Sequence, residues 1–173
     1  MREWKMALVA LATLAPAAAW ARSAACDVGA AQLAGMRENW TGPPPVIHRG
    51  PVGAIKVESR GSFSGKPDGV VSPPLFEAWN ANQTHANLFD ACPELQSLLP
   101  AGWRYATPEE EAMKLGGPST WVTSFAEPLV MGDQALAYWS AQCPGLCAQM
   151  MVVLYRRGSK GWSAVGPAAI AMS

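Results

Sequence analysis

Residues 134–165 read QALAYWSAQCPGLCAQMMVVLYRRGSKGWSAV, and this stretch decides the fold. Residues 134–142 alternate between two sets of side chains, which is the pattern of a β-strand with two distinct faces. One set holds Ala135, Ala137, Trp139 and Ala141, and the other holds Leu136, Tyr138, Ser140 and Gln142. Apolar runs at residues 150–155 and 162–165 follow, separated by the turn sequence RRGSKG. We therefore predict three antiparallel strands joined in order, a β-meander.

The turn between the first two of these strands is bounded by Cys143 and Cys147. Cysteines at the ends of a tight hairpin lie within the separation of about 5.5 Å between Cα atoms that a disulfide requires. A structural disulfide is therefore the favoured interpretation. Two alternatives stay open, a redox-active thiol pair and a copper site that also uses the nearby Met150 and Met151. Both are less favoured, since three residues separate the cysteines and no histidine follows His85.

This C-terminal region resembles a group of uncharacterised exported bacterial proteins whose pattern is Ala-Leu-x-Tyr, a Cys-Gly-x-Leu-Cys-Gly turn, an apolar strand and Gly-x-Trp. The matching residues are 134–138, Cys143, Leu146, Cys147, Gly161 and Trp162, whereas Pro144 and Ala148 replace the glycines of the pattern. The resemblance covers about a quarter of the chain. It implies an exported protein with a C-terminal hairpin, and it implies no particular activity.

The remaining cysteines, Cys26 and Cys92, complete an even number. Four cysteines allow three pairings, and a bond between Cys143 and Cys147 leaves Cys26 to pair with Cys92. An even number of cysteines in an exported chain favours disulfides over metal sites, so we expect no metal site.

The N-terminus has the features of a secretion signal over residues 1–21, which we expect to be removed. Arg2 and Lys5 precede an apolar run at residues 6–15, and residues 19–21 form the small-x-small cleavage pattern. About ten apolar residues are too few to span a membrane permanently. We therefore predict a periplasmic or secreted protein without a stable membrane span. A lipid anchor on Cys26 is the less favoured alternative, because Ser23 stands where such sites usually have leucine.

Residues 22–173 are expected to form a single α+β domain, with N-terminal helices packed on one face of a C-terminal antiparallel sheet. Disulfides are expected to cross-link this domain. The pattern predicts a helix within residues 26–40, with Asp27 as its N-cap and residues 42–45 (GPPP) as its end. Short strands are predicted within residues 46–59 and one helix over residues 74–89. Thr107, Pro108 and Glu110 form the capping box of a further short helix.

Composition excludes some partners. Lysine and arginine together number 13, as do aspartate and glutamate, and no basic run is present, which argues against nucleic acid as a partner. No glycine-rich phosphate loop is present, so no cofactor is expected. The six tryptophans after residue 21 could form a sugar- or peptide-binding platform, but their even spacing favours packing in the core.

Candidate catalytic groups are sparse. His48 and His85 are the two histidines, and the clustered Glu109, Glu110 and Glu111 are typical of a helix N-terminus. The favoured hypothesis is therefore a non-catalytic module that binds or stabilises an unidentified ligand or protein of the cell envelope. The alternatives are an envelope hydrolase that uses His85, and a thiol or copper protein that uses Cys143 and Cys147.

Overall fold

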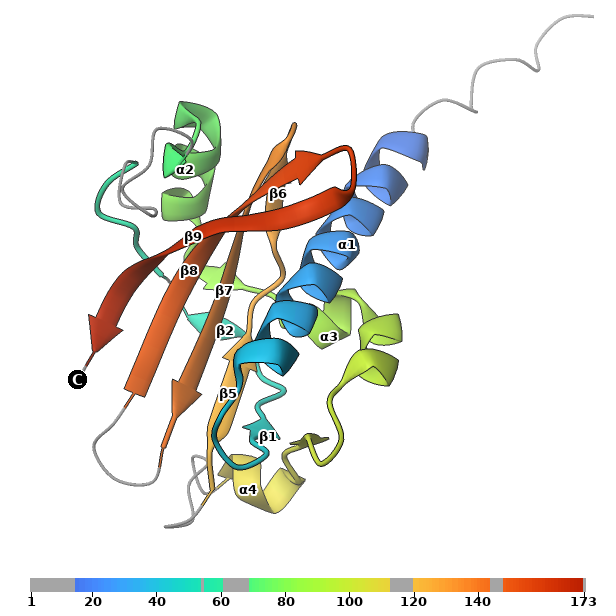
Figure 1. Cartoon of the computed structure of the whole chain (residues 1–173), viewed down its shortest axis with the longest axis vertical. Helices are drawn as coiled ribbons and strands as arrows, with labels where there is room; N and C mark the ends of the chain where they lie inside the picture. The colour runs from blue at the N-terminus through green and yellow to red at the C-terminus, as the bar shows by residue number, and fades with distance from the viewer. Residues whose placement is uncertain (1–14, 54, 61–68, 113–119, 144–147, 173) are drawn as a thin grey trace, which may run out of the picture.

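The computed structural model describes residues 15–53, 55–60, 69–112, 120–143 and 148–172 as an α+β fold (Figure 1). Its helices are α1 (Ala15–Asn39), α2 (Pro73–Ala81), α3 (Leu88–Ala91), α4 (Pro108–Ala112) and the 3-10 helix η2 (Pro93–Leu98). The short strands are β1 (Val46–Ile47), β2 (Val52–Gly53), β3 (Thr84–His85), β4 (Arg104–Tyr105), β5 (Val122–Phe125) and β6 (Leu129–Met131). The long strands are β7 (Gln134–Gln142), β8 (Ala148–Gly158) and β9 (Gly161–Met172).

The predicted meander is confirmed, since β7, β8 and β9 pair in order and antiparallel. The complete sheet is mixed, however, because strands outside the predicted C-terminal meander add parallel pairs to it. Strand β1 lies between β4 and β5 and pairs parallel with both, while β5 and β6 pair antiparallel with β7. Crossover connections that bring β1 between two later strands leave no local signal in the sequence.

Helices cover both faces of the sheet, which corrects the prediction that they occupy one face. Figure 1 shows α1 and α2 on opposite sides of β7, β8 and β9. Because successive side chains of a strand point to opposite faces, β7 contributes to two separate cores. Leu136 and Tyr138 pack with α2, whereas Ala135 and Ala137 pack with Val28 of α1.

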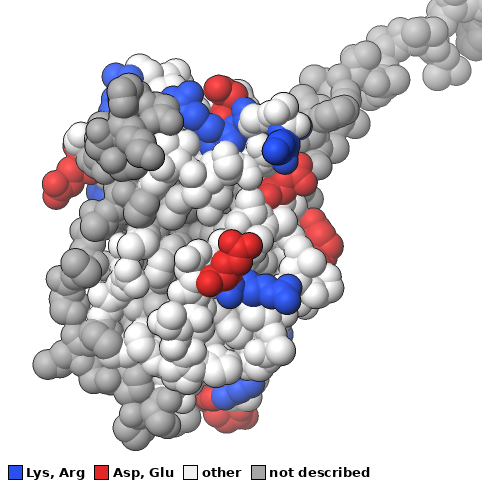
Figure 2. All heavy atoms as spheres, in the orientation of Figure 1, with Lys and Arg blue, Asp and Glu red and all other residues white. Residues whose placement is uncertain are grey.

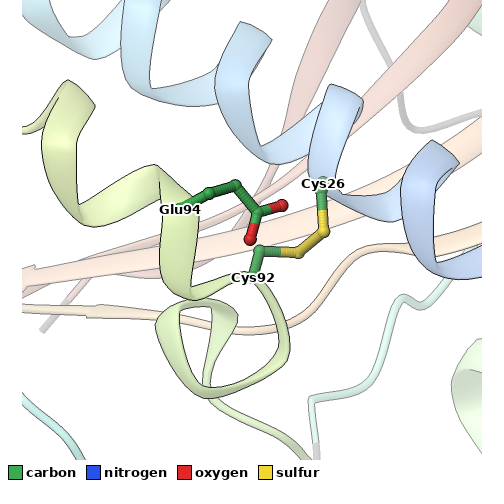
Figure 3. A group of neighbouring side chains, drawn as sticks. All are labelled: Cys26, Cys92 and Glu94. Atoms are coloured by element: carbon green, nitrogen blue, oxygen red, sulfur yellow. A yellow bond between two sulfur atoms is a disulfide. The ribbon is translucent and has the colours of Figure 1, made fainter.

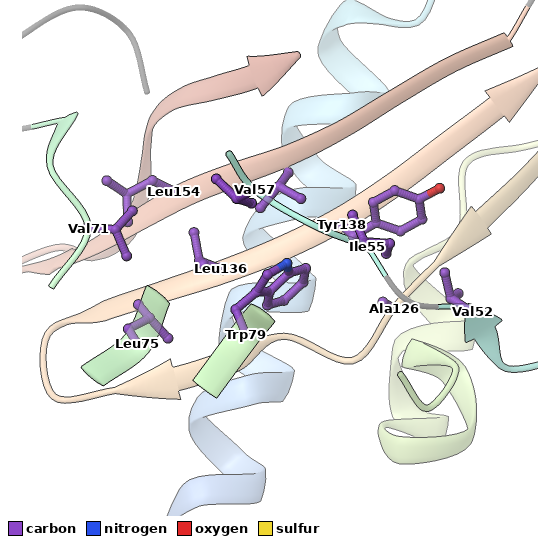
Figure 4. Close-up of a cluster of buried hydrophobic side chains, with 11 residues drawn as sticks. Val52, Ile55, Val57, Val71, Leu75, Trp79, Ala126, Leu136, Tyr138 and Leu154 are labelled. Atoms are coloured by element: carbon purple, nitrogen blue, oxygen red, sulfur yellow. The ribbon is translucent and has the colours of Figure 1, made fainter. Parts of the chain in front are cut away.

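The α2 face is closed by a continuous apolar core (Figure 4). Leu75 and Trp79 of α2 are fully buried against Leu136 of β7 and Leu154 of β8. The segment that leads into α2 is fixed by Gln134, whose amide nitrogen donates to the oxygen of Val70 at 3.0 Å. Its amide oxygen accepts from the backbone nitrogen of Ser72 at 2.8 Å.

On the other face, the N-terminal part of α1 approaches α3 and η2 closely. A Cβ atom added to Gly29 would lie 2.6 Å from a methyl group of Leu88 and 2.8 Å from one of Leu95. The absence of a side chain at Gly29 therefore allows this contact. Helix α1 begins at Ala15 and ends at Asn39, so Asp27 lies inside the helix and the prediction that Asp27 is its N-cap was wrong.

The helix predicted over residues 74–89 is wrong beyond Ala81, where α2 ends. Thr84 and His85 form β3, which pairs with β2, and Asn87 then begins α3. Asn80 exchanges two hydrogen bonds with the backbone of Val57, at 2.9 and 3.0 Å. Asn87 is the N-cap of α3, and its side chain accepts from the backbone nitrogen of Phe89 at 2.9 Å. Asparagine side chains compete for backbone groups in this way, which makes them favourable at caps and unfavourable inside helices.

Candidate functional site

A groove of about 690 Å³ lies between the C-terminal half of α1 and the long strands. Helix α1 contributes Gln32, Gly35, Met36 and Asn39 to it. Residues at spacings of three, four and seven share one face of a helix, so this set forms a single stripe along α1. One face of α1 therefore forms a wall of the groove where the helix packs on the sheet.

The strands supply the opposite wall of the groove. Trp139 of β7 pairs with Met151 of β8, and Val153 and Tyr155 follow on the same face of β8. Alternate positions of a strand share a face, and this face is the one that α1 covers. The wall is consequently apolar and aromatic, and Gln149 adds a polar side chain at one end.

Three tryptophans meet at this groove although they are far apart in the sequence. Trp40, Trp121 and Trp139 all line it. The rings of Trp40 and Trp121 make an edge-to-face contact with centroids 5.6 Å apart, and the indole nitrogen of Trp40 donates to the oxygen of Pro43 at 3.0 Å. The sequence spacing favoured core and sheet packing for the six tryptophans, and Trp40 and Trp139 do pack against buried clusters while they also line the groove. Of the others, Trp79 and Trp103 are buried as predicted.

Gln32 is the unusual polar residue of the groove. Its side chain is 2% exposed, and neither its amide nitrogen nor its amide oxygen has a hydrogen-bond partner. Among the described residues, no other side chain has two buried atoms without a partner. A buried amide without partners costs free energy that a hydrogen-bonded one does not, so such groups in native proteins call for an explanation.

The groove is electrically neutral. The described residues that line it include no lysine, arginine, aspartate or glutamate. Burial raises the pKa of the Tyr155 hydroxyl above its ordinary value, so this side chain is also uncharged near neutral pH. The site therefore suits an uncharged ligand, because a charged one would lose its hydration without gaining an opposite charge.

His85, the candidate catalytic base, lies outside this groove. It pairs with Val52 across β2 and β3, is 5% exposed, and packs its ring against Trp79 with centroids 4.4 Å apart. Its Nε2 atom has no hydrogen-bond partner. Burial, and secondly the charge of Lys56, lowers the pKa of His85. A neutral, enclosed imidazole on an aromatic ring matches a core residue better than a base that must reach a substrate.

His48 follows β1, where its backbone nitrogen donates to the oxygen of Thr123 at 2.9 Å and its own oxygen accepts from Asn87. These bonds connect β1 to β5 and α3, so this segment has a structural role.

The glutamates near residue 110 also have structural contacts. Glu110 forms two 2.7 Å hydrogen bonds with the guanidinium of Arg104, which lower its pKa to about 2. It also completes the predicted capping box, since Thr107 and Glu110 exchange backbone-to-side-chain bonds at 2.8 and 3.3 Å. The capping box is confirmed, and Glu110 stabilises the start of α4.

The disulfide between Cys26 and Cys92 joins α1 to the end of α3, as predicted (Figure 3). The bonded residues are 66 positions apart, and in the chain-entropy model a loop of that length contributes about 4 kcal/mol. The carboxylate of Glu94 lies within 4.8 Å of both sulfur atoms. Because the two sulfurs are bonded to each other, this cluster is a cross-link.

Cys143 is also disulfide-bonded, and its predicted partner Cys147 lies outside the described residues. A thiol or copper role for Cys143 would require reduction of that bond.

Lysine and arginine are mixed with aspartate and glutamate on the face shown in Figure 2, and broad uncharged areas separate them. None of the helices in the described ranges is both long and apolar enough to cross a membrane.

The sequence contained one signal for the groove that the prediction missed. Gln32, Gly35 and Asn39 interrupt the apolar positions of α1 on a single face of the helix. Polar and glycine residues at that spacing could have indicated an opening beside the helix.

Comparison with known proteins does not assign this site. No protein-family model matches the chain. No curated protein and no solved structure matches it either.

Proposed function

We propose that this chain is a non-catalytic exported module that binds an uncharged, largely apolar ligand in the groove between α1 and β7–β9. The observation that carries the proposal is the groove itself, whose strand wall is apolar and aromatic and whose described lining carries no lysine, arginine, aspartate or glutamate. An uncharged, apolar ligand would gain free energy by leaving water for such a lining.

Gly35 supports the same conclusion independently. It lies inside α1, where glycine is less favourable than alanine by about 1 kcal/mol. Gly29, the other glycine of the described helix, is explained by its close neighbours, but a Cβ atom at Gly35 would meet nothing within 4 Å. Packing therefore does not require Gly35, whereas an open groove does.

The lining matches a binding site. Ligand sites are commonly concave, lined by apolar and aromatic side chains, and provided with a few polar groups that fix orientation. Trp139, Met151 and Val153 supply apolar surface here, and Asn39 and Gln149 supply polar side chains. Methionine side chains also adapt readily to ligands of different shape.

Export is part of the proposal. The secretion signal at residues 1–21 supports it, and the Cys26–Cys92 disulfide agrees with an oxidising compartment. A periplasmic or secreted location follows. The unidentified ligand or partner then belongs to the cell envelope or its surroundings.

Titration with Nile red, an uncharged apolar dye, tests the groove. We expect the dye to bind the purified chain and to lose at least about tenfold in affinity in Gly35→Phe, whose side chain would fill the open space. Gly53→Phe is the matched control, since a Cβ atom at Gly53 also meets nothing within 4 Å and Gly53 lies outside the groove. Equal dye affinity in both variants would contradict the proposal.

A hydrolase panel on wild type and His85→Ala tests the catalytic alternative. An activity that disappears with His85 would favour a hydrolase over a binding module. Titration of free thiols in protein from its native compartment tests the thiol or copper alternative, which requires reduced Cys143.

A further inference from the structure

The groove between α1 and the long strands is more enclosed at one end than at the other. On α1, the lining residues Gln32 and Met36 are buried, whereas Asn39, which lies further along the same helix, is exposed. A helix rises about 1.5 Å per residue, so this change takes place over about 10 Å. The α1 wall of the groove therefore passes from the interior of the protein to its surface.

The strand wall changes in the same way along β8. Val153 and Tyr155 are buried, and Met151 and Gln149, which precede them on the same face of the strand, are half-buried. In Figure 1, the turn between β8 and β9 lies beside α1, and the opposite ends of these strands lie further from the helix. Because the helix and the strands diverge, both walls become more exposed toward the same end of the groove.

The inner end of the groove, formed by Gln32, Val153 and Tyr155, is mainly apolar. Val28, one turn before Gln32 on α1, packs in one cluster with Val153 and Tyr155, so the buried parts of the two walls meet here. Both amide atoms of Gln32 are enclosed and out of reach of a ligand. The side chain of Ala164, which is exposed and pairs with Tyr155 from β9, is a single methyl group. A ligand at this end therefore meets carbon atoms and at most the hydroxyl of Tyr155.

The outer end of the groove, formed by Asn39, Thr41 and Gln149, is polar and open to water. Asn39 and Thr41 are exposed, and Gln149 is half-buried. The amide nitrogen of Asn39 donates to the oxygen of Gly35 at 2.7 Å, while its amide oxygen remains able to accept a hydrogen bond. A hydroxyl group at this end would keep its hydration and could bond to these side chains.

We propose that the groove holds an uncharged amphiphile with one apolar chain. The chain lies toward the inner end, and a hydroxyl-bearing head lies at the outer end. This inference rests on the proposed function, because it names the class of ligand for the same site. A volume of about 690 Å³ falls within the range of about 300–1,000 Å³ that is usual for small-molecule sites.

Two other classes of uncharged ligand match the inner end less well. An oligosaccharide carries hydroxyl groups along its whole length, and a peptide carries backbone N–H and C=O groups. Either ligand would bring polar groups into the inner end, where they would lose their hydration without equivalent hydrogen bonds. An amphiphile with one chain places only carbon atoms there, so it gains the free energy of apolar burial without that cost.

Three soluble probes test the inference on wild-type protein, by calorimetry and by displacement of Nile red. Octan-1-ol should bind about ten- to fifteenfold more tightly than hexan-1-ol, because two more CH₂ groups are buried. Octane-1,8-diol should bind at least about tenfold more weakly than octan-1-ol, because its second hydroxyl must enter the inner end. Equal affinities for octan-1-ol and octane-1,8-diol would overturn the inference.

Two neighbouring valines of β8 provide a matched pair of variants. Val153 lines the inner end, whereas Val152 is buried on the opposite face, in the α2 core. Val153→Thr adds a hydroxyl to the inner end, so it should weaken octan-1-ol binding about three- to tenfold and narrow its difference from octane-1,8-diol. Val152→Thr places the same hydroxyl in a core and should change octan-1-ol affinity by less than about twofold. An equal loss in both variants would overturn the placement of the chain.

The outcomes separate this inference from the proposed function. If Nile red binds in a manner sensitive to Gly35→Phe and octan-1-ol does not displace it, the groove remains a ligand site and the amphiphile assignment fails. Displacement of the dye by oligosaccharides or short peptides alone would likewise overturn the amphiphile assignment and leave the groove a ligand site. If neither the dye nor octan-1-ol binds wild type, the proposed function fails as well.

Discussion

A buried glutamine lies on each face of the β7–β8 sheet, and the two differ in whether their amide atoms have hydrogen-bond partners. On the α2 face, Gln134 bonds to the backbone of residues 70 and 72, and an apolar core surrounds that contact. On the α1 face, Gln32 is buried to a similar degree and has no partner. The α2 face therefore satisfies its buried glutamine within the chain, whereas the α1 face leaves the amide of Gln32 without a partner.

This difference predicts that substitutions on the two faces will change the stability of the fold in different ways. On the α2 face, the removal of a side chain should lower the stability of the fold, because the side chains there already have packing or hydrogen-bond partners. An open face can gain stability from the same kind of change, since natural proteins tolerate unfavourable groups at functional sites. The first two of the following predictions compare one residue on each face, the third compares two positions of α1, and the fourth concerns the α2 side alone.

The largest effect is expected for tryptophans. Trp79→Ala on the α2 face should reduce the free energy of unfolding by about 3–5 kcal/mol, because the ring is fully buried. Trp139→Ala on the α1 face should cost about half as much, since part of that ring lines the groove. Urea unfolding followed by circular dichroism measures both. Equal losses would show that the α1 face is packed as tightly as the α2 face.

The two glutamines should respond with opposite signs. Gln134→Met leaves the backbone groups of Val70 and Ser72 without their partner and should destabilise the fold by about 2 kcal/mol. Gln32→Met removes a buried amide without partners and should stabilise the unliganded protein by about 1 kcal/mol. Urea midpoints of the two variants provide the comparison. A loss of stability in Gln32→Met would indicate that its amide already has a partner.

The two glycines of α1 should also differ in sign. Gly35→Ala has open space and a better helix former, so it should add about 0.5–1 kcal/mol. Gly29→Ala would press on Leu88 and Leu95, which are buried, and should cost about 1 kcal/mol in spite of the helix propensity. Thermal unfolding of both variants in the same buffer measures the difference. Stabilisation by both would mean that α1 can move away from α3.

The smallest effect concerns pH and His85 on the α2 side. Its pKa is lowered from the ordinary value of 6.5 in the folded state, so the unfolded chain binds a proton more readily. Stability should therefore be complete above pH 6.5 and decline as the pH falls below that value. In His85→Gln this part of the pH dependence should disappear, and urea titrations across the range measure it. An unchanged pH profile would exclude His85 as the source.

The sequence predicted those parts of the fold that depend on local patterns. Strand β7 begins at Gln134 and ends at Gln142, as the alternation of its side chains indicated. The capping box at Thr107 and Glu110 also depends on neighbouring residues alone. The helix predicted over residues 74–89 failed beyond Ala81, because residues 84–85 pair with β2 and the side chain of Asn87 bonds to the backbone of His48, and both partners lie far away in the sequence.

The strand wall of the groove could not be predicted for the same reason, although the spacing of Gln32, Gly35 and Asn39 marks its α1 side. Trp121 reaches it because β5 pairs with the end of β7, and Trp40 reaches it because β1 follows α1 and lies beside β5. Even spacing of tryptophans along the chain carries no information about these pairings. The absence of a partner for Gln32 likewise depends on every element that surrounds it.

The position of β1 has a consequence for the order of folding. Val46 pairs with Arg104 on one side and with Val122 on the other, so this two-residue strand depends entirely on chain that is synthesised later. Contacts between distant residues form slowly because a long loop must close first. The N-terminal half would therefore complete its folding after the meander, which is made of neighbouring strands. We expect the C-terminal third to be the part that organises the rest of the molecule.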